Sequence, residues 1–412
     1  MNDKGYINNS TAVIRLFFTT LILSILCTGC SYYGIEIEEE EEVVAVARPD
    51  KPVEVGVYYV PHTKESATAM EATLAASTPR FPEQFQPKRP SLQTTGKTGI
   101  NLRKQANLAH SKGIDAFIFH WHCNSEGPYQ NYMPELFADR RIPVALRYAL
   151  IWKNDHADSL GDKRSTGADF RKVIDHLVDD HFKSKAYWRV DGGKPYFSIY
   201  DLKRFLEGYA STELAKRSLR MLRNRTTAAG HPGLHLNATT YGLSPDEAAT
   251  LRTELELDSL TTYNWSNDGL VDERPGTDYL KAIEAYFAAA SAGELGYYNG
   301  PMVPSVSMGW DPAPLWASDE TWKTSNDYPY GPIIVNNNAG RFGKALSQAK
   351  ALAKEQQRSF VLLHAWNDWL HGSYLEPEEM FKDSYLNGIK HEFIDQEEVD
   401  LERMRRWRHA NR

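Results

Sequence analysis

Short apolar segments alternate with longer amphipathic segments along most of this chain. The apolar segments have the length of strands, and the longer ones have helical spacing, which is typical of repeated strand and helix units around a parallel sheet. The strand candidates lie at residues 54–60, 116–120, 143–148, 195–200, 234–239, 259–263, 302–307 and 360–363. Eight strands of this kind predict an α/β fold, a closed (β/α)8 barrel of the TIM type.

The length of the chain fits one such barrel. At 412 residues it has room for a barrel with insertions, a leader and a tail. We expect one large domain at 53–412, in which the barrel ends near Phe393 and the basic tail at 401–412 forms a closing helix. Helices are predicted at residues 102–111, 169–180, 213–223, 278–290 and 339–355, and long loops at 63–99 and 309–332.

Residues 1–30 have the pattern of a leader. The apolar run at 16–26 is too short to anchor the chain across a bilayer, but it has the length of a signal-peptide core. It ends at Cys27-Thr-Gly-Cys30, which resembles a bacterial lipobox, although Cys27 stands where the pattern prefers Leu. The alternative is ordinary secretion with two incidental cysteines. We expect an exported protein that is lipidated at Cys30 and held to a membrane by this lipid.

An acidic run follows the leader. Six of the seven residues at 36–42 are Glu, and their mutual repulsion prevents them from forming a core. Residues 31–52 are therefore predicted to be a solvated tether. The run is similar to the surface-export signal of Bacteroidetes lipoproteins, which implies a lipoprotein of the bacterial cell envelope, located in the outer membrane and facing the cell surface.

The composition argues against nucleic acid as a partner. The chain has 47 Lys and Arg against 54 Asp and Glu, a net charge of −7, and a pI near 6.0. Phosphate binding depends on a basic surface, which this balance does not favour. Of the 3 Cys, only Cys123 would remain in the folded domain, so no disulfide framework is expected. No cofactor is predicted, and the sequence leaves the oligomeric state open.

The strongest candidate site follows the last predicted strand. The apolar run at 360–363 leads directly into His364-Ala-Trp-Asn-Asp-Trp-Leu-His-Gly-Ser-Tyr-Leu-Glu-Pro377. In parallel α/β folds, ligands bind just beyond the carboxyl ends of the strands. Asp368 and Glu376 supply carboxylates there, His371 supplies an imidazole, and the Trp and Tyr side chains supply flat apolar faces. This combination suits a sugar.

Aromatic and polar residues follow the other predicted strands as well. A closed barrel brings these strand ends around one mouth, where rings can stack on sugar faces and polar groups can bind hydroxyls. The prediction is a cleft for a poly- or oligosaccharide. Its predicted binding residues are Tyr59, His62, His120, Trp121, His122, Arg147, Tyr148, Tyr200, Tyr241, Tyr263, Asn264, Trp265, Trp310, Trp366, Asn367 and Trp369.

Several of these segments resemble a known family. Trp366-Asn-Asp-Trp-Leu-His-Gly372, with Leu375-Glu-Pro377 after it, is similar to the Asn-Glu-Trp-x-Glu-Gly…Glu-Pro pattern of WbsX-type proteins and of glycoside hydrolase family 99, the endo-α-mannosidase group. Four further segments follow in the family's order, at 55–61, 113–122, 193–200 and 303–311. The resemblance covers most of the mature chain and implies a barrel that acts on glycans.

The resemblance also implies roles for individual residues. In the hydrolase family both Glu residues of the pattern are catalytic, and this sequence has Asp368 and His371 in their places. By position, Asp368 takes the role of base and His371 that of general acid. If the acid lies elsewhere, Glu376 and Asp311 are the acidic alternatives near strand ends. The chain is thus predicted to be an exported, lipid-anchored glycoside hydrolase.

Other functions remain open at this point. The histidines 62, 120, 122, 364 and 371 near strand ends would also suit a metal site, although no metal is predicted. A polysaccharide lyase would need a cation for a uronate, for which Arg147 is the candidate. A WbsX-type glycosyltransferase conflicts with export, because nucleotide-sugar donors are cytoplasmic. A non-catalytic glycan-binding lipoprotein is the remaining alternative, since both Glu residues of the family pattern are replaced.

Overall fold

The computed structural model describes nine parts of the second of two compact units, which comprise residues 1–36 and 37–412. The described residues are 51–78, 98–129, 132–138, 145–154, 166–266, 271–291, 302–316, 321–325 and 328–396. The predicted leader, Cys30, the acidic run at 36–42 and the basic tail lie outside them. Among the described residues, no helix is both long and apolar enough to cross a membrane.

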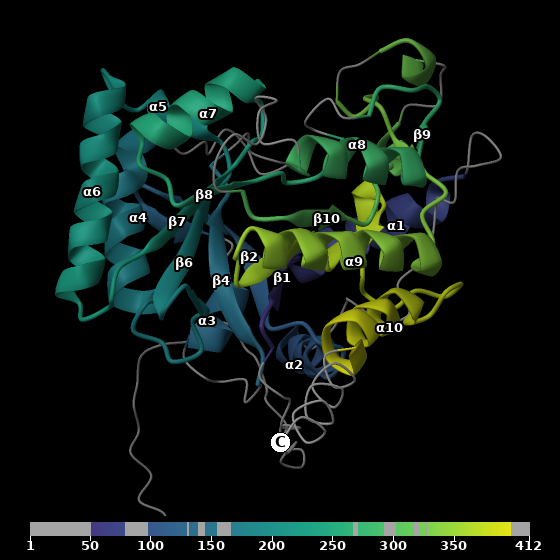
Figure 1. Cartoon of the computed structure of the whole chain (residues 1–412), viewed down its shortest axis with the longest axis horizontal. Helices are drawn as coiled ribbons and strands as arrows, with labels where there is room; N and C mark the ends of the chain where they lie inside the picture. Colours follow the sequence, from purple (N-terminus) through teal and green to yellow (C-terminus); the bar gives the residue numbers. More distant parts are fainter. Residues whose placement is uncertain are drawn as a thin grey trace, which may run out of the picture. The chain divides into compact units, whose positions relative to one another are not determined.

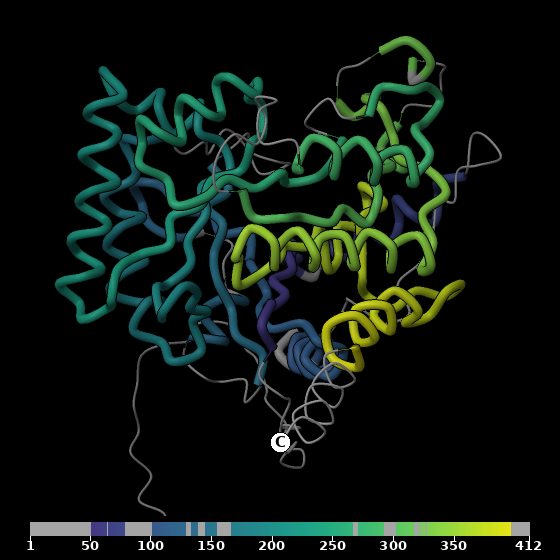
Figure 2. The backbone as a smooth tube through the Cα atoms, viewed as in Figure 1, coloured from purple at the N-terminus to yellow at the C-terminus, as the bar shows by residue number. Residues whose placement is uncertain are grey.

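Eight parallel strands form the central sheet, in the order β10-β12-β1-β2-β4-β6-β7-β8. Their bounds are Glu54–Tyr59 (β1), Ala116–Asn124 (β2), Arg147–Trp152 (β4), Lys194–Ile199 (β6), His235–Thr239 (β7), Ser259–Thr261 (β8), Ser305–Ser307 (β10) and Phe360–His364 (β12). A parallel bridge from Leu260 to Met302 joins the two ends of this order. The first and last strands, β1 and β12, pair directly. Figure 2 traces the course of the chain from β1, in purple, to α10, in yellow. The predicted (β/α)8 barrel is confirmed.

Helices surround the strands (Figure 1). The longer ones are Lys64–Ala76 (α1), Thr98–Ser111 (α2), Thr212–Ala228 (α6), Pro245–Glu254 (α7), Tyr279–Ser291 (α8) and Ala339–Glu355 (α9); the shorter ones are Tyr132–Ala138 (α3), Phe170–His176 (α4), Leu202–Leu206 (α5) and Ser384–Lys390 (α10). α9 illustrates why they form. Asn338 caps its first turn, and Phe342, Leu346 and Ala349 recur on the face that it buries.

The third strand begins later in the chain than predicted. The prediction was 143–148, whereas β4 starts at Arg147 and ends at Trp152. The apolar run continues to Trp152, and pairing with β2 selects this later window, with Arg147 opposite Ala116. The prediction that Arg147 follows a strand is therefore wrong. It lies at the amino end of the barrel, where its Nη2 is 2.7 Å from Glu54 Oε1.

The predicted loop at 63–99 contains a helix. Thr63 caps α1 by accepting a hydrogen bond from the Ser66 backbone N–H. The weak apolar periodicity of this segment gave no helical signal, but Met70 and Leu74 are buried against Trp369 and Tyr374 in the completed fold. α1 therefore covers the outer side of the loop that follows β12.

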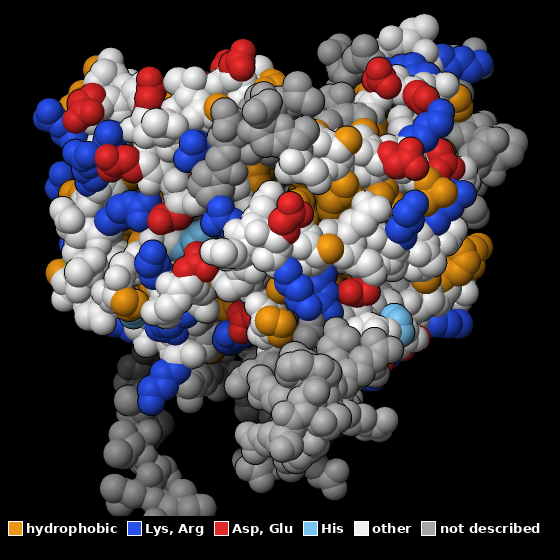
Figure 3. All heavy atoms as spheres, in the orientation of Figure 1, with side chains coloured by type: hydrophobic (Ala, Val, Ile, Leu, Met, Phe, Trp, Pro, Cys, Tyr) orange, Lys and Arg blue, Asp and Glu red, His pale blue; other side chains and the backbone are white. Residues whose placement is uncertain are grey.

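Charges of both signs are intermixed on the face of the molecule drawn in Figure 3. On α6, Arg220 pairs with Glu256 at 2.6 Å and Arg225 pairs with Asp175 at 3.0 Å. Water and salt screen the attraction in such exposed pairs, so each contributes little to stability. These pairs stabilise the outer helices only modestly.

Candidate active site

The loop after β12 folds back as a small hairpin. Its strands are Asn367–Asp368 (β13) and Ser373–Tyr374 (β14), joined by the 3-10 turn Trp369–His371. Gly372 ends that turn in the left-handed region, at φ 63°, which glycine adopts without strain. The hairpin directs Asp368 and His371 toward the barrel mouth, while Trp369 and Tyr374 stack on each other on the other side, next to α1.

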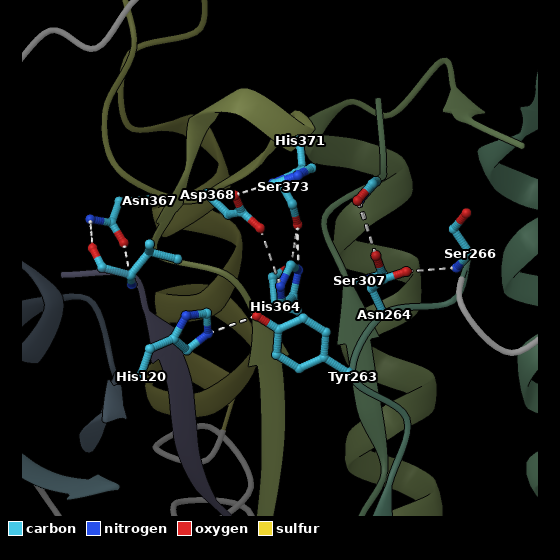
Figure 4. A network of polar contacts seen from close by, with 12 residues as sticks. His120, Tyr263, Asn264, Ser266, Ser307, His364, Asn367, Asp368, His371 and Ser373 are labelled. Atoms are coloured by element: carbon cyan, nitrogen blue, oxygen red, sulfur yellow. Dashed lines mark hydrogen bonds and ion pairs between the residues drawn. The ribbon is translucent and has the colours of Figure 1, made fainter. Parts of the chain in front are cut away.

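Asp368 and His371 form a hydrogen-bonded dyad (Figure 4). His371 Nδ1 lies 2.6 Å from Asp368 Oδ1. Burial alone would raise the pKa of the Asp368 carboxyl, but the charge and hydrogen bond of His371 outweigh burial, so this pKa is lowered. The Trp310 ring stacks on the His371 imidazole, with ring centroids 4.6 Å apart and planes inclined by 8°. The dyad therefore consists of an ionised carboxylate and an imidazole fixed in orientation.

A second histidine faces the same carboxylate. His364 Nε2 is 3.6 Å from Asp368 Oδ2, and its Nδ1 is 2.9 Å from Ser373 Oγ. The Ser373 hydroxyl donates its only hydrogen to the His364 carbonyl, at 2.8 Å, so Nδ1 must be the donor in the other contact. Burial lowers the pKa of His364 to about 4. At neutral pH, His364 is therefore uncharged, with its proton on Nδ1.

Aromatic rings line the mouth beside these groups. Tyr263 OH lies 2.7 Å from His120 Nε2, and burial lowers the pKa of His120 well below its usual range. Tyr200 stacks on Tyr241 at 4.6 Å and meets Tyr263 edge to face at 4.8 Å. Lys153 Nζ lies 3.2 Å from the centroid of the Tyr200 ring. The mouth thus combines flat rings, a cation and hydrogen-bonding groups.

The family model described as Glycosyltransferase WbsX matches residues 72–389. The chain belongs to this family. The match begins within α1 and ends within α10, so it covers the barrel except for β1, and it confirms the resemblance that the sequence motifs indicated. A comparison with curated proteins finds none that matches this chain.

Solved structures share the fold. A GH99 endo-alpha-mannosidase from Bacteroides thetaiotaomicron, in complex with Bis-Tris-propane, is 15% identical and covers 87% of this chain and 98% of its own, with a TM-score of 0.52. A structure described as a glycoside hydrolase-like protein is 16% identical and covers 86% and 97% of the two chains, with a TM-score of 0.54. At such identities the likeness supports the barrel fold alone.

Part of the predicted site is brought together at the mouth. Besides Asp368, His371 and Trp310, the interlinked rings include His120, Tyr200, Tyr241 and Tyr263. His62 lies close enough for Asp368 to raise its pKa, although burial dominates and the net effect lowers it. His122 in turn acts on the pKa of His120, so it belongs to the same neighbourhood.

Several predicted binding residues instead lie on the outer side of the barrel wall. Alternate residues of a strand point to opposite faces, and the sequence did not show which set faces inward. The outward set packs on helices or on other aromatic rings. It comprises Tyr59 on Phe117 and Phe119, Trp121 on His181, Tyr148 on Tyr187, Trp265 on Tyr279 and Tyr286, Trp366 on Phe117, and Trp369 on Tyr374.

Glu376 also lies behind the wall, and this corrects the expectation that it joins the cleft. Its Oε2 accepts a hydrogen bond from Trp369 Nε1, and its Oε1 accepts one from Gln105 Nε2 of α2, both at 2.9 Å. Burial raises the pKa of Glu376 to about 8. Glu376 thus ties the site loop to α2 as a neutral group at neutral pH.

Three other predicted residues hold the backbone of the mouth. Asp311 Oδ1 accepts from the Ala313 N–H at 3.1 Å, while the Asp311 N–H donates to the His371 carbonyl at 2.7 Å. The Asn367 amide bonds to both the N–H and the carbonyl of Val60, each at 2.9 Å. Asn264 Oδ1 accepts from the Ser266 N–H. These contacts fix the loops that carry the dyad.

The sequence did not point to Lys153, Ser373 or Tyr328, and it indicated His364 only as a possible metal ligand. Tyr328 lies in a loop without periodicity, and nothing in its neighbours marks it, yet its OH is 3.0 Å from His371 Nε2. The described residues contain no group of three or more His, Cys, Asp or Glu side chains arranged to hold a metal ion. The hydrogen-bonded side chains of Asp368, His371 and Tyr328 can support proton transfer.

Proposed function

We propose that the protein is a glycoside hydrolase that cleaves a poly- or oligosaccharide at the mouth of the barrel. The observation that carries this proposal is the Asp368–His371 dyad, which stands at the carboxyl end of β12 with Trp310 stacked on its imidazole. Such a dyad can accept or deliver a proton at a glycosidic oxygen or at water. The fold shared with glycosidases adds support as an analogy.

The geometry changes the roles that the sequence motif implied. Acid and base of a glycosidase flank the scissile bond and lie about 5–9.5 Å apart. Asp368 and His371 are hydrogen-bonded at 2.6 Å, so they act as one unit. Asp368 orients the imidazole and stabilises its protonated form, and His371 is the group that exchanges the proton.

The surrounding rings support a sugar as the substrate. Tyr200, Tyr241 and Tyr263 present aromatic faces and hydroxyls beside the dyad, and sugars bind to such surfaces through both. Lys153 adds a cation in the same mouth. Arg147, the cation that a lyase was expected to use, lies at the opposite end of the barrel.

A transferase is the second candidate, because the matching family model carries that description. The two functions differ in the acceptor, which is water for a hydrolase and a second sugar for a transferase. They also differ in the donor, which is a glycan for the hydrolase and a nucleotide sugar for the transferase. Product analysis with a nucleotide sugar as the added donor separates them. Transfer from that donor, without hydrolysis of any polysaccharide, would favour the transferase.

We also propose that the protein is exported and anchored through a lipid on Cys30. The apolar run at 16–26, the lipobox-like sequence ending at Cys30 and the acidic run after it support this proposal. Cell fractionation of a Cys30→Ala variant tests it. A shift from the membrane to the soluble fraction is expected, and retention of the variant in the membrane fraction would contradict lipidation at this residue.

The test of the enzymatic proposal is a polysaccharide digestion screen with product analysis. We expect the wild-type protein to release oligosaccharides, and His371→Gln to reduce turnover by a factor of roughly 10² or more while the fold is kept. His176→Gln is a matched control, because His176 at the end of α4 forms an equally short 2.6 Å pair with Asp180 and does not belong to the hairpin that carries the dyad. Glycan binding without turnover by the wild-type protein would identify a non-catalytic binding protein instead.

A further inference from the structure

We propose that Tyr328 is a further catalytic residue, which rests on the proposed function and extends it. Its hydroxyl lies 3.0 Å from His371 Nε2, and His371 Nδ1 lies 2.6 Å from Asp368 Oδ1. The three side chains form a continuous line from an ionised carboxylate through an imidazole to a phenol. This is the arrangement of an activated hydroxyl with a base and a group that orients the base.

The direction of the hydrogen bonds follows from the donors available. A carboxylate can only accept, so the proton of His371 Nδ1 points to Asp368. In neutral His371 the other ring nitrogen, Nε2, then carries the lone pair. Tyr328 must donate to it, and no other hydrogen bond among the described residues uses the lone pairs of the phenol oxygen.

Two other parts of His371, one face of its ring and its carbonyl, are in contact with the rest of the chain. Trp310 covers one face of its ring, at 4.6 Å between centroids. Its carbonyl accepts from the Asp311 N–H at 2.7 Å. Tyr328 is 69% exposed, whereas His371 is largely covered. A substrate that approaches the dyad therefore meets the phenol oxygen before it meets the imidazole.

The segment that carries Tyr328 is held in place by the fold. Trp316 Nε1 donates to the Pro329 carbonyl at 3.0 Å, and Arg274 Nη2 donates to the Tyr330 carbonyl at 3.3 Å. The Tyr330 ring packs on the cluster formed by Ala313, Trp316, Ile333 and Val335. These contacts fix the backbone on the carboxyl side of Tyr328. The fold therefore helps to hold the phenol next to His371.

We infer that the phenol relays a proton. As water attacks the anomeric carbon, it gives a proton to Tyr328 Oη, which passes its own proton to His371 Nε2. The carbon–oxygen bond to water forms, the glycosidic bond breaks, and its electron pair leaves with the aglycone oxygen, which takes a proton from solvent water. The imidazolium, stabilised by Asp368, returns its proton to solvent by the same route, so the net change is hydrolysis.

Tyr328→Phe tests this inference, with Tyr330→Phe as its matched control two residues along the same segment. The assay uses a saccharide that the wild-type protein cleaves and His371→Gln does not, which establishes the proposed function beforehand. We expect Tyr328→Phe to lower kcat by about 10- to 100-fold with KM little changed, and Tyr330→Phe to match the wild-type protein.

Three results would overturn the inference while leaving the proposed function intact. One is a Tyr328→Phe variant with wild-type kcat. Another is a faster variant, which would make Tyr328 a plug over the dyad. The third is a glycosyl adduct on Tyr328, detected by mass spectrometry, which would make the phenol a nucleophile instead of a relay. If no saccharide is cleaved by the wild-type protein and left intact by His371→Gln, the proposed function itself fails, and the relay fails with it.

Discussion

Asp368 and Glu376 belong to the same loop, yet the barrel uses them in opposite ways. Asp368 faces the mouth, where His371 holds the pKa of its carboxyl low despite burial. Glu376 lies behind the wall, where burial raises its pKa to about 8 and Trp369 and Gln105 bond to its oxygens. One carboxyl is charged at neutral pH and the other is neutral.

The difference shows that the partner of a buried carboxyl decides its role. A carboxylate beside an imidazole keeps its charge and can support proton transfer, whereas one held only by neutral N–H donors loses its charge to burial. Sequence position does not separate the two cases, because both residues follow the same strand. The hairpin between β13 and β14 separates them by turning the loop back on itself.

The largest effect is expected from removing the charge at the mouth. Asp368→Asn should lower turnover by a factor of roughly 10² or more, because an amide can neither hold His371 in its working tautomer nor stabilise the imidazolium. Glu376→Gln should leave turnover within a few-fold of the wild-type value. Steady-state kinetics checks both variants, and equal losses would abolish the distinction between the two carboxyls.

Glu376 should instead control how stability depends on pH. Its pKa in the fold, about 8, lies above the unfolded value near 4.5, so its contribution is complete below pH 4.5 and is lost as pH rises toward 8. The loss is on the order of 1 kcal/mol per pH unit in this window. Denaturant unfolding between pH 5 and 8 should show this slope in the wild-type protein and a flatter one in Glu376→Gln. The same slope in both would assign the pH dependence to other groups.

A smaller effect is expected from the ring that supports the dyad. Trp310→Ala removes the surface stacked on His371, and aromatic stacking of this kind is worth about 0.5–1.5 kcal/mol. Turnover should fall roughly 2- to 10-fold, which is less than in Asp368→Asn. A Trp310→Phe variant keeps a ring there and should recover most of the loss, whereas equal activity of the Ala variant and the wild-type protein would show that the stack does not position His371.

The smallest effect is expected at the amino end of the barrel. Arg147 and Glu54 form a pair that is about one third exposed, so Arg147→Ala should cost at most about 1 kcal/mol of unfolding free energy. Turnover should not change, because this pair is at the opposite end of β4 from the mouth. A large loss of turnover with unchanged stability would mean that the amino end takes part in catalysis.

The parts of the fold that rest on periodicity could be predicted from the sequence. α9 has the predicted bounds, because its apolar residues recur at helical spacing and Asn338 marks its start. β4 was misplaced, since the apolar run before Trp152 is longer than one strand and only pairing with β2 selects the window. α1 was missed because its few buried residues gain their partners from a loop about 300 residues away.

The site was predictable only in part for a related reason. Asp368 and His371 stand out because polar residues directly follow an apolar strand. Whether a ring faces the mouth or a helix depends on strand register, which the sequence leaves open by one residue, so Tyr59 and Trp121 were assigned to the wrong side. Tyr328 depends on a contact with a residue 43 positions away, for which no local pattern exists.

The central claim is that Asp368 and His371 act as one proton-transfer unit, and a double-mutant cycle tests it most directly. The measurement is kcat on a cleaved saccharide for Asp368→Asn, His371→Gln and the double variant. Residues that act as a unit are not additive, so the double variant should lie within a few-fold of the slower single variant. A double variant slowed by the product of the two single losses, roughly 10⁴-fold or more, would show that they act independently, as a separate acid and base.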